Sequence, residues 1–283
     1  MSNAQKFGGP WTVEKLNILS DYLDFYTTAL KNQPFQLVYI DAFAGSGRIE
    51  IGDQGEREVI DGSARLALKS AGHFAEYIFI EKSSSSVEKL NNMVSQEFPD
   101  KARLVKIMNE DCNTALLEIC RKINWKKTRA VLFLDPYAAD VKWETLRTIA
   151  ATKAIDVWYL FPFNAVNRMM KKSGVTDPKL ANKLNAIFGD SSWKTEFYRK
   201  DDQTNLFEEM AIVRYMSTDS LKEYIEERLR TIFPGVSSHS RLLLNSKNSP
   251  LFLFCFAVSN DNPKAIGLAF KVANYILKDQ RPS

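Results

Sequence analysis

The stretch Gln36-Leu-Val-Tyr-Ile-Asp41-Ala-Phe-Ala-Gly45-Ser-Gly47 decides the fold of this chain. Its first part is rich in β-branched and aromatic residues, which predicts a buried strand over residues 36–43. The two glycines that follow allow the backbone to turn tightly and to approach a bound ligand. Open α/β sheets bind ligands at this end of their strands. The stretch therefore predicts a first strand with a ligand-binding turn at its carboxyl end.

Strands and helices alternate on both sides of this stretch. Apolar runs predict further strands at residues 77–80, 103–108, 130–134 and 155–161. Apolar residues at helical spacing predict helices at residues 13–30, with Thr12 as its cap, and at 63–70, 83–98, 114–123 and 143–151. This alternation indicates a parallel sheet, and the continuously apolar strands indicate that helices cover both of its faces.

The C-terminal part closes the sheet differently. Residues 241–244 and 251–258 flank Asn245-Ser-Lys-Asn-Ser-Pro250 as in a hairpin, and helices are predicted at 220–233 and 263–277. Five alternating units closed by an antiparallel hairpin are the architecture of methyltransferases that use S-adenosylmethionine (SAM). We therefore predict an α/β fold with a mostly parallel, seven-stranded Rossmann-like methyltransferase sheet. Residues 9–163 and 220–283 would form it, and residues 164–219 a helical insertion over the active face.

Composition narrows the class of protein. Of 283 residues, 45% are hydrophobic and 25% charged, which is typical of soluble globular proteins. A net charge of +4 permits an anionic partner such as nucleic acid without requiring one. Three cysteines without CxxC spacing and two histidines argue against a metal site and a disulfide framework. No signal peptide or membrane span is expected, so we predict a cytoplasmic protein.

The turn after the first strand is the predicted cofactor site. Its cofactor-binding candidates are Asp41, Phe43, Ala44, Gly45 and Gly47. A dinucleotide fingerprint would need glycine at position 50, which is Glu50, and no P-loop motif is present. The alternative is a tight turn in which the first aspartate only caps the backbone.

Polar residues also follow the second and third predicted strands. Glu81 and Lys82 end the second, where a carboxylate would accept hydrogen bonds from ribose hydroxyls. Asp111 and Cys112 end the third, where the carboxylate could accept from an adenine amine and the cysteine amide could donate to a ring nitrogen. The alternatives are that Glu81 only solvates a strand end and that Asp111 or Asn113 caps a helix.

The fourth strand runs into the predicted catalytic residues, Asp135, Pro136 and Tyr137. They resemble the (D/N)-P-P-(Y/F) motif of amino-methyltransferases. There, the acid and a carbonyl accept hydrogens from an amine, and the aromatic ring stacks on the acceptor. Here tyrosine stands in place of the second proline. An ordinary strand-to-loop exit is the alternative, because Asp-Pro often opens a turn.

Residues after the fifth strand complete the predicted site. Phe161, Asn164 and Arg168 could contact the substrate, although the pattern slightly favours the alternative that they only end the strand. Basic and aromatic residues of the insertion, among them Lys171, Lys172 and Lys194, are the candidates for contacting an anionic substrate.

At these residues the sequence resembles the bacterial three-Cys-motif partner protein family. The matching stretches are Gly9-Pro10-Trp11-Thr12 with Lys15-Leu16, YIDAFAGSGR, DGSARLAL, FIEK, VLFLDPYA and KAIDVWYLFP. The resemblance covers most of residues 9–170. It implies a Rossmann-like methyltransferase fold and a separate functional partner protein with three cysteines, and it leaves the substrate open.

Two functions follow from these patterns, and a different nucleotide-dependent enzyme on the same fold is a third possibility, because a fold does not fix a function. The first is a SAM-dependent methyltransferase, N-directed on nucleic acid or a base-like ring. The second is a catalytically silent binding module that keeps the fold and docks a protein partner or nucleic acid.

Overall fold

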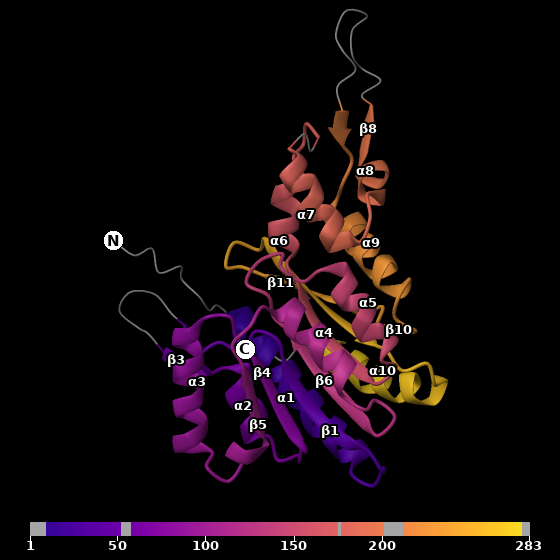
Figure 1. The fold of residues 1–283 in the computed structure, drawn as a ribbon. Helices are drawn as coiled ribbons and strands as arrows, with labels where there is room; N and C mark the ends of the chain where they lie inside the picture. The colour runs from indigo at the N-terminus through magenta and orange to yellow at the C-terminus, as the bar shows by residue number, and fades with distance from the viewer. Residues whose placement is uncertain (1–9, 52–57, 175–176, 201–211, 279–283) are drawn as a thin grey trace, which may run out of the picture.

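A mixed sheet of eight strands lies at the centre of the computed structural model, which describes residues 10–51, 58–174, 177–200 and 212–278. Five strands run parallel: β1 (Gln36–Asp41), β4 (Glu76–Ile80), β5 (Val105–Met108), β6 (Thr128–Leu134) and β7 (Ile155–Phe161). β4 and then β5 lie on one side of β1, and β6 and then β7 on the other (Figure 1). The carboxyl ends of all five therefore meet at one edge.

Antiparallel strands close the sheet beside β7. β12 (Pro250–Val258) pairs with β7 along one edge. Its other edge pairs with two short strands, β10 (Gly235–Val236) and β11 (Arg241–Leu244). The sequence predicts β11 and β12 but not β10, which has only two residues and no pattern of its own. This order confirms the predicted α/β class with a mostly parallel Rossmann-like methyltransferase sheet, but the sheet has eight strands rather than the predicted seven, because β10 adds one.

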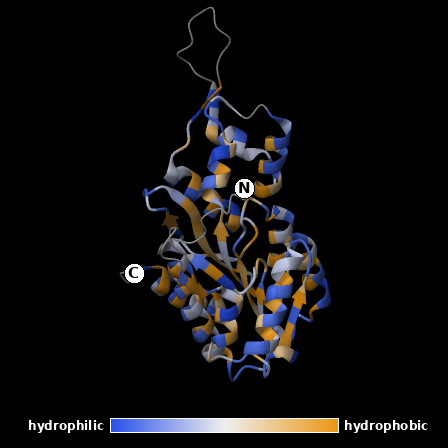
Figure 2. Ribbon diagram, turned by 90° about the vertical axis from the view of Figure 1, so that its left-hand side faces the viewer, coloured by the Kyte–Doolittle hydropathy of each residue, from blue (hydrophilic) through white to orange (hydrophobic). Residues whose placement is uncertain are grey.

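Helices cover both faces of the sheet. Val38 and Ile40 of β1 belong to the core beneath α4 (Cys112–Lys122), α5 (Trp143–Ala151) and α9 (Thr218–Arg230). Tyr39 belongs to the opposite core, beneath α1 (Pro10–Leu30), α2 (Ser63–Lys69), α3 (Ser84–Glu97) and α10 (Pro263–Lys278). Successive strand residues point to opposite faces, so both cores need apolar residues from the same strands. Figure 2 shows the hydrophobic residues gathered on these strands.

Several predicted boundaries shift. α1 begins at Pro10, so Thr12 lies inside the helix and is not its cap. Proline suits a first helical turn because its missing N–H would have no partner there. β1 ends at Asp41 rather than at residue 43, and a short 3-10 helix, Ala102–Leu104, replaces the start of the third predicted strand.

The insertion is only partly helical. It contains α6 (Phe163–Met169), α7 (Pro178–Phe188) and α8 (Ser192–Phe197). It also contains an antiparallel pair, β8 (Tyr198–Lys200) and β9 (Ile212–Arg214), so the purely helical prediction is wrong. In Figure 1 these elements form an arm that projects from one end of the sheet. The polar segment after β1 likewise contains an antiparallel pair, β2 (Arg48–Ile51) and β3 (Glu58–Asp61).

The half-buried carboxyl of Asp156, at the start of β7, leads to a prediction about how the stability depends on pH. Tyr22 donates a 2.7 Å hydrogen bond to Asp156, and burial raises the pKa of this aspartate to about 6. A folded-state pKa above the unfolded value means that Asp156 contributes stability at low pH and that this contribution is lost as the pH rises through about 6. Asparagine cannot titrate. We therefore subtract the unfolding free energy at pH 7.5 from that at pH 4.5. This difference should be lower in Asp156→Asn than in wild type by roughly 2 kcal/mol.

Urea unfolding of both proteins at the two pH values measures this difference, in which any pH-independent effect of the amide cancels. The matched control is Asp261→Asn, because Lys153 lowers the pKa of that exposed carboxyl and its pH effect has the opposite sign. An equal pH difference in wild type and Asp156→Asn would contradict the assignment.

Candidate active site

The glycine turn after β1 has the geometry that the sequence predicts. Gly45 and Gly47 have φ angles of +59° and +80°, in the left-handed region that favours glycine. A Cβ on Gly47 would lie 2.6 Å from Sδ of Met93 on α3, so a side chain there would also require the flexible end of Met93 to shift. A Cβ on Gly45 would meet nothing within 4 Å. The turn therefore presents open space beside the Gly45 backbone.

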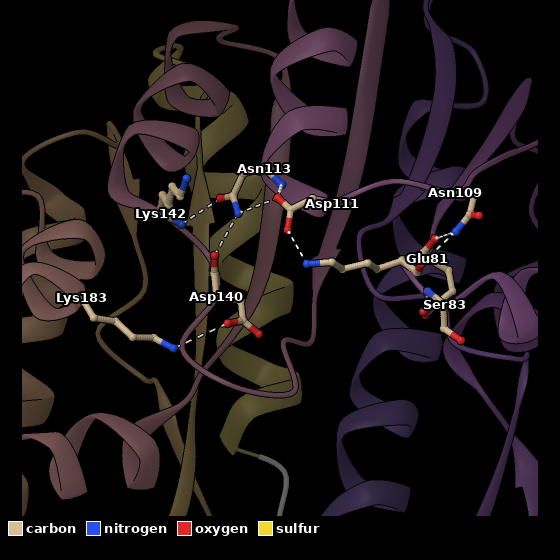
Figure 3. Close-up of polar contacts among 9 residues, drawn as sticks. Glu81, Ser83, Asn109, Asp111, Asn113, Asp140, Lys142 and Lys183 are labelled. Carbon is tan, nitrogen blue, oxygen red and sulfur yellow. Dashed lines mark hydrogen bonds and ion pairs between the residues drawn. The ribbon is translucent and has the colours of Figure 1, made fainter. Parts of the chain in front are cut away.

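Glu81 joins the second strand tip to this turn. Its Oε2 accepts a 3.0 Å hydrogen bond from the Gly45 amide, and its Oε1 accepts a 2.7 Å bond from the Ser83 amide. Asn109 of the third tip donates to the Glu81 and Lys82 carbonyls at 2.9 and 3.0 Å (Figure 3). An ionised carboxylate has about four acceptor positions, so Glu81 can still accept from further hydroxyl donors.

Asp41 is fully buried at the end of β1. Its Oδ1 accepts a 3.1 Å bond from the Phe43 amide, and Tyr39 donates to Oδ2 at 3.4 Å. Burial raises the pKa of Asp41 to about 6, and the nearby negative charge of Asp135 contributes to the rise. The alternative interpretation, in which Asp41 only caps the turn, is therefore correct for this residue. Asp41 is too buried to touch a ligand.

Asp111 caps α4: its Oδ1 accepts a 3.0 Å hydrogen bond from the Asn113 amide. The sequence predicts helix capping as the alternative role of this residue. Partial burial by itself raises the pKa of Asp111, but hydrogen bonds from Asn113 and the charge of Lys82 bring it below its usual value. Lys82 Nζ lies 3.6 Å from Asp111 Oδ2, across the gap between the second and third tips. The Cys112 thiol is buried, so only its amide, in the first turn of α4, is suited to a ligand.

Asn113 is a site residue that the sequence assigns only to capping. It is buried, and its Oδ1 accepts from the Lys142 amide and the Thr145 hydroxyl, both at 2.9 Å. Its Nδ2 donates to the Asp140 carbonyl at 2.9 Å (Figure 3). Asn113 therefore fixes the loop after β6 to the third strand tip. No local pattern reveals this role, because the partners lie about 30 residues away.

The loop after β6 carries Asp135, Pro136 and Tyr137. The Asp135 side chain is 20% exposed, and the Tyr137 side chain is largely exposed. Lys15 of α1 donates a hydrogen bond to Asp135 Oδ2, and the Lys15 side chain is only 5% exposed. The sequence does not predict this ion pair, which joins residues 120 positions apart.

The three predicted substrate residues differ in their exposure to solvent. Phe161 is 3% exposed and stacks on Phe188, with ring centroids 6.1 Å apart. A side chain in this position cannot contact a substrate, so that prediction for Phe161 is wrong; the ring anchors the arm. Asn164 is partly exposed and Arg168 is exposed, both on α6 directly after β7.

The arm also reaches the loop after β6. Lys183 Nζ of α7 lies 3.8 Å from Asp140 Oδ1 (Figure 3). A separate groove of about 560 Å³ runs along α5 and α9, and it includes Trp143, Arg147, Lys153 and Arg228.

Among the described residues, no group of three or more His, Cys, Asp or Glu side chains is placed to hold a metal ion. No helix within the residues that the structure describes is long and apolar enough to cross a membrane.

No family model and no curated protein matches the chain. Solved structures match it at low identity. A Legionella pneumophila protein of the family DUF519 is 13% identical over 92% of this chain and 91% of its own, with a TM-score of 0.48. Spermidine synthase of Thermotoga maritima is 11% identical over 90% and 61%, with a TM-score of 0.42. The methyltransferase domain of bacterial CtHen1-C is 10% identical over 86% and 99%, with a TM-score of 0.38. These TM-scores are below 0.5, so the fold assignment rests on the strand order: this chain has a methyltransferase-type α/β fold.

Proposed function

We propose that this protein is a SAM-dependent methyltransferase whose cofactor lies at the tips of β1, β4 and β5. The observation that carries the proposal is the 3.0 Å hydrogen bond from the Gly45 amide to Glu81. It joins the glycine turn to the carboxylate of the next strand, on a sheet with the methyltransferase strand order. These are the two features that a nucleoside needs: close backbone approach and an acceptor for ribose hydroxyls.

The residues at the tips fit the parts of SAM. The open space at Gly45 admits a ligand against the backbone, and Glu81 keeps acceptor positions for ribose hydroxyls. The Cys112 amide can donate to an adenine ring nitrogen, and Asp111 can accept from the adenine amine. Lys82 pairs with Asp111, and buried Asp41, which accepts from the Phe43 amide, maintains the turn together with Ala44 and Gly47. When bound, SAM supplies a methyl group on a positively charged sulfur.

The loop after β6 supports transfer to nitrogen. Asp135 is partly exposed and can accept a hydrogen bond from an amine, which keeps the nitrogen lone pair aimed at the methyl group. The exposed ring of Tyr137 can stack on a planar acceptor. Tyr137 replaces the second proline of the amino-methyltransferase motif, so Pro136 is the one proline that shapes this loop.

The arm supports an anionic, base-bearing acceptor such as nucleic acid. Exposed cations in the described part of the arm are Arg168, Lys171, Lys172, Lys179, Lys183, Lys194 and Arg199. Phosphate contacts of this kind position a nucleic acid without reading its sequence. A base in a duplex would have to be flipped out to reach the loop after β6.

Calorimetric titration with SAM and its demethylated product, S-adenosylhomocysteine (SAH), tests the cofactor. Wild type should bind both, and Glu81→Gln should weaken both by about 10- to 100-fold, because hydrogen bonds from ribose hydroxyls to a charged acceptor are lost. The matched control is Glu118→Gln on the exposed side of α4, which should bind as wild type does. If wild type binds neither ligand at millimolar concentration, the cofactor assignment is wrong.

One observation favours the second function, a catalytically silent binding module. Asp135 already accepts a hydrogen bond from Lys15, so part of its acceptor capacity is used within the protein. In that case SAM would bind, but no acceptor would be methylated. A separate three-cysteine partner protein, which the family resemblance implies, would then be the natural ligand of the arm.

A further inference from the structure

A buried ammonium group stands at the acceptor side of the site. Lys15 Nζ donates to Asp135 Oδ2, and its side chain is only 5% exposed. The same nitrogen lies 4.8 Å from the centroid of the Trp11 ring, whose face also attracts a cation. A buried lysine is costly unless it is paired, so Asp135 is the anion that permits Lys15 to be there.

The helix that carries Lys15 is fixed on both sides. Trp11 packs against Phe252 of β12, with ring centroids 5.2 Å apart. Glu14 forms a 2.5 Å ion pair with Arg241 of β11. α1 is therefore anchored to the antiparallel end of the sheet, and Lys15 reaches Asp135 from a rigid element.

This pairing leaves one carboxylate oxygen available. Within the described residues, Asp135 has one hydrogen-bond partner, Lys15, which uses Oδ2. Oδ1 can therefore accept from an acceptor amine. Asp41 lies close enough for the charge of Asp135 to raise its pKa, so the tips of β1 and β6 hold two carboxyls and one ammonium.

We propose that Lys15 is a positioning and specificity-determining residue: it orients Asp135 and neutralises its charge, so that the site accepts a neutral planar amine and not a protonated alkylamine. The proposal rests on the proposed methyltransferase function. A carboxylate that is already paired with an ammonium group attracts a second cation weakly, but it still accepts a hydrogen bond from a neutral N–H group. Exocyclic amines of nucleobases are of this neutral kind.

The test measures charge at the position of the transferred methyl group. Sinefungin carries a protonated amine where SAM carries its methylated, positively charged sulfur. SAH has an uncharged sulfur at this position. The ratio of sinefungin affinity to SAH affinity, measured by calorimetry at one pH and one salt concentration, therefore reports the local charge. Lys15→Met exposes the full charge of Asp135, so this ratio should rise at least about tenfold. Asp135→Asn leaves Lys15 uncompensated, so the ratio should fall by a similar factor.

Two further variants separate charge from structure. Lys15→Arg keeps the positive charge, and the double variant Lys15→Met/Asp135→Asn removes both charges. Both should show the wild-type ratio within about threefold. A purely structural lysine would change the affinities of both ligands together and leave their ratio constant. If Lys15→Met does not fold, the difference between Asp135→Asn and the double variant measures the same charge.

The outcomes distinguish the role of Lys15 from the binding of the cofactor. The role of Lys15 is wrong if wild type, Lys15→Met and Asp135→Asn all bind SAH and their affinity ratios agree within about twofold. The cofactor assignment would still stand in that case. Failure of wild type to bind SAH or sinefungin at millimolar concentration would overturn the proposed function and this role with it.

Discussion

Asp135→Asn should transfer methyl groups about 10²- to 10³-fold more slowly than wild type, with SAH affinity unchanged within about threefold. The amide oxygen can still accept a hydrogen bond from Lys15, but the amide NH2 then takes the position of Oδ1 and cannot accept a hydrogen bond from the acceptor amine. Lys15, with a side chain only 5% exposed, then places an uncompensated positive charge beside the acceptor. A tritiated-methyl transfer screen on DNA, RNA and cell lysate measures the rate.

Asparagine is preferable to alanine here. Alanine would leave a buried lysine without a hydrogen-bonded carboxylate, which typically costs about 3–5 kcal/mol and would confuse folding with catalysis. Asp100→Asn is the control, because that residue is exposed in the turn after α3. Equal labelling by wild type and Asp135→Asn would remove Asp135 from catalysis. Absence of labelling by wild type, together with SAH binding, would instead favour the silent binding module.

Gly189→Ala should lower the unfolding free energy by about 3 kcal/mol or more. Gly189 ends α7 with a φ of +91°, and its amide donates to the Asn185 carbonyl at 2.7 Å. A Cβ would lie 2.2 Å from Cδ1 of Trp143, a buried ring at the start of α5. Arg228 covers that ring at 4.9 Å and also donates to the Phe188 carbonyl, so the indole has little room to move. The glycine is where the arm packs onto the sheet domain.

Gly45→Ala is the matched comparison. Gly45 also has a positive φ, +59°, but a Cβ there meets nothing within 4 Å. Its cost should be limited to backbone strain, about 1–2 kcal/mol. Chemical unfolding of both variants separates the steric part from the strain. Equal destabilisation by the two substitutions would show that Trp143 moves aside at little cost.

Much of the fold was predictable because its signals are local. The strands of the parallel sheet are apolar runs of four to seven residues, and the polar residues that follow each run mark the tips. In a parallel sheet such tips meet at one edge by geometry alone. The positions of Gly45, Glu81, Asp111 and Asp135 could therefore be predicted without knowing any contact. β10 and the pair of β8 with β9 could not, because strands of two or three residues have no distinct pattern.

The same reasoning explains the errors at the site. A phenylalanine at a strand end can face a ligand or a helix, and only the position of α7 decided that Phe161 packs on Phe188. A polar residue after a strand can bind a ligand or cap a helix, and Asp111 does cap α4. Burial depends on which element covers a residue, and a sequence does not specify that covering.

The sequence by itself determined the order of strands and helices, the glycine turn at Gly45 and Gly47, and the carboxylates at the strand tips. It could do so because side-chain periodicity and turn chemistry act between neighbours in the chain. Only the tertiary structure decided that Lys15 pairs with Asp135 and that Asn113 holds the loop after β6. These contacts join residues about 30 to 120 positions apart, and such contacts depend on how packed elements approach in space.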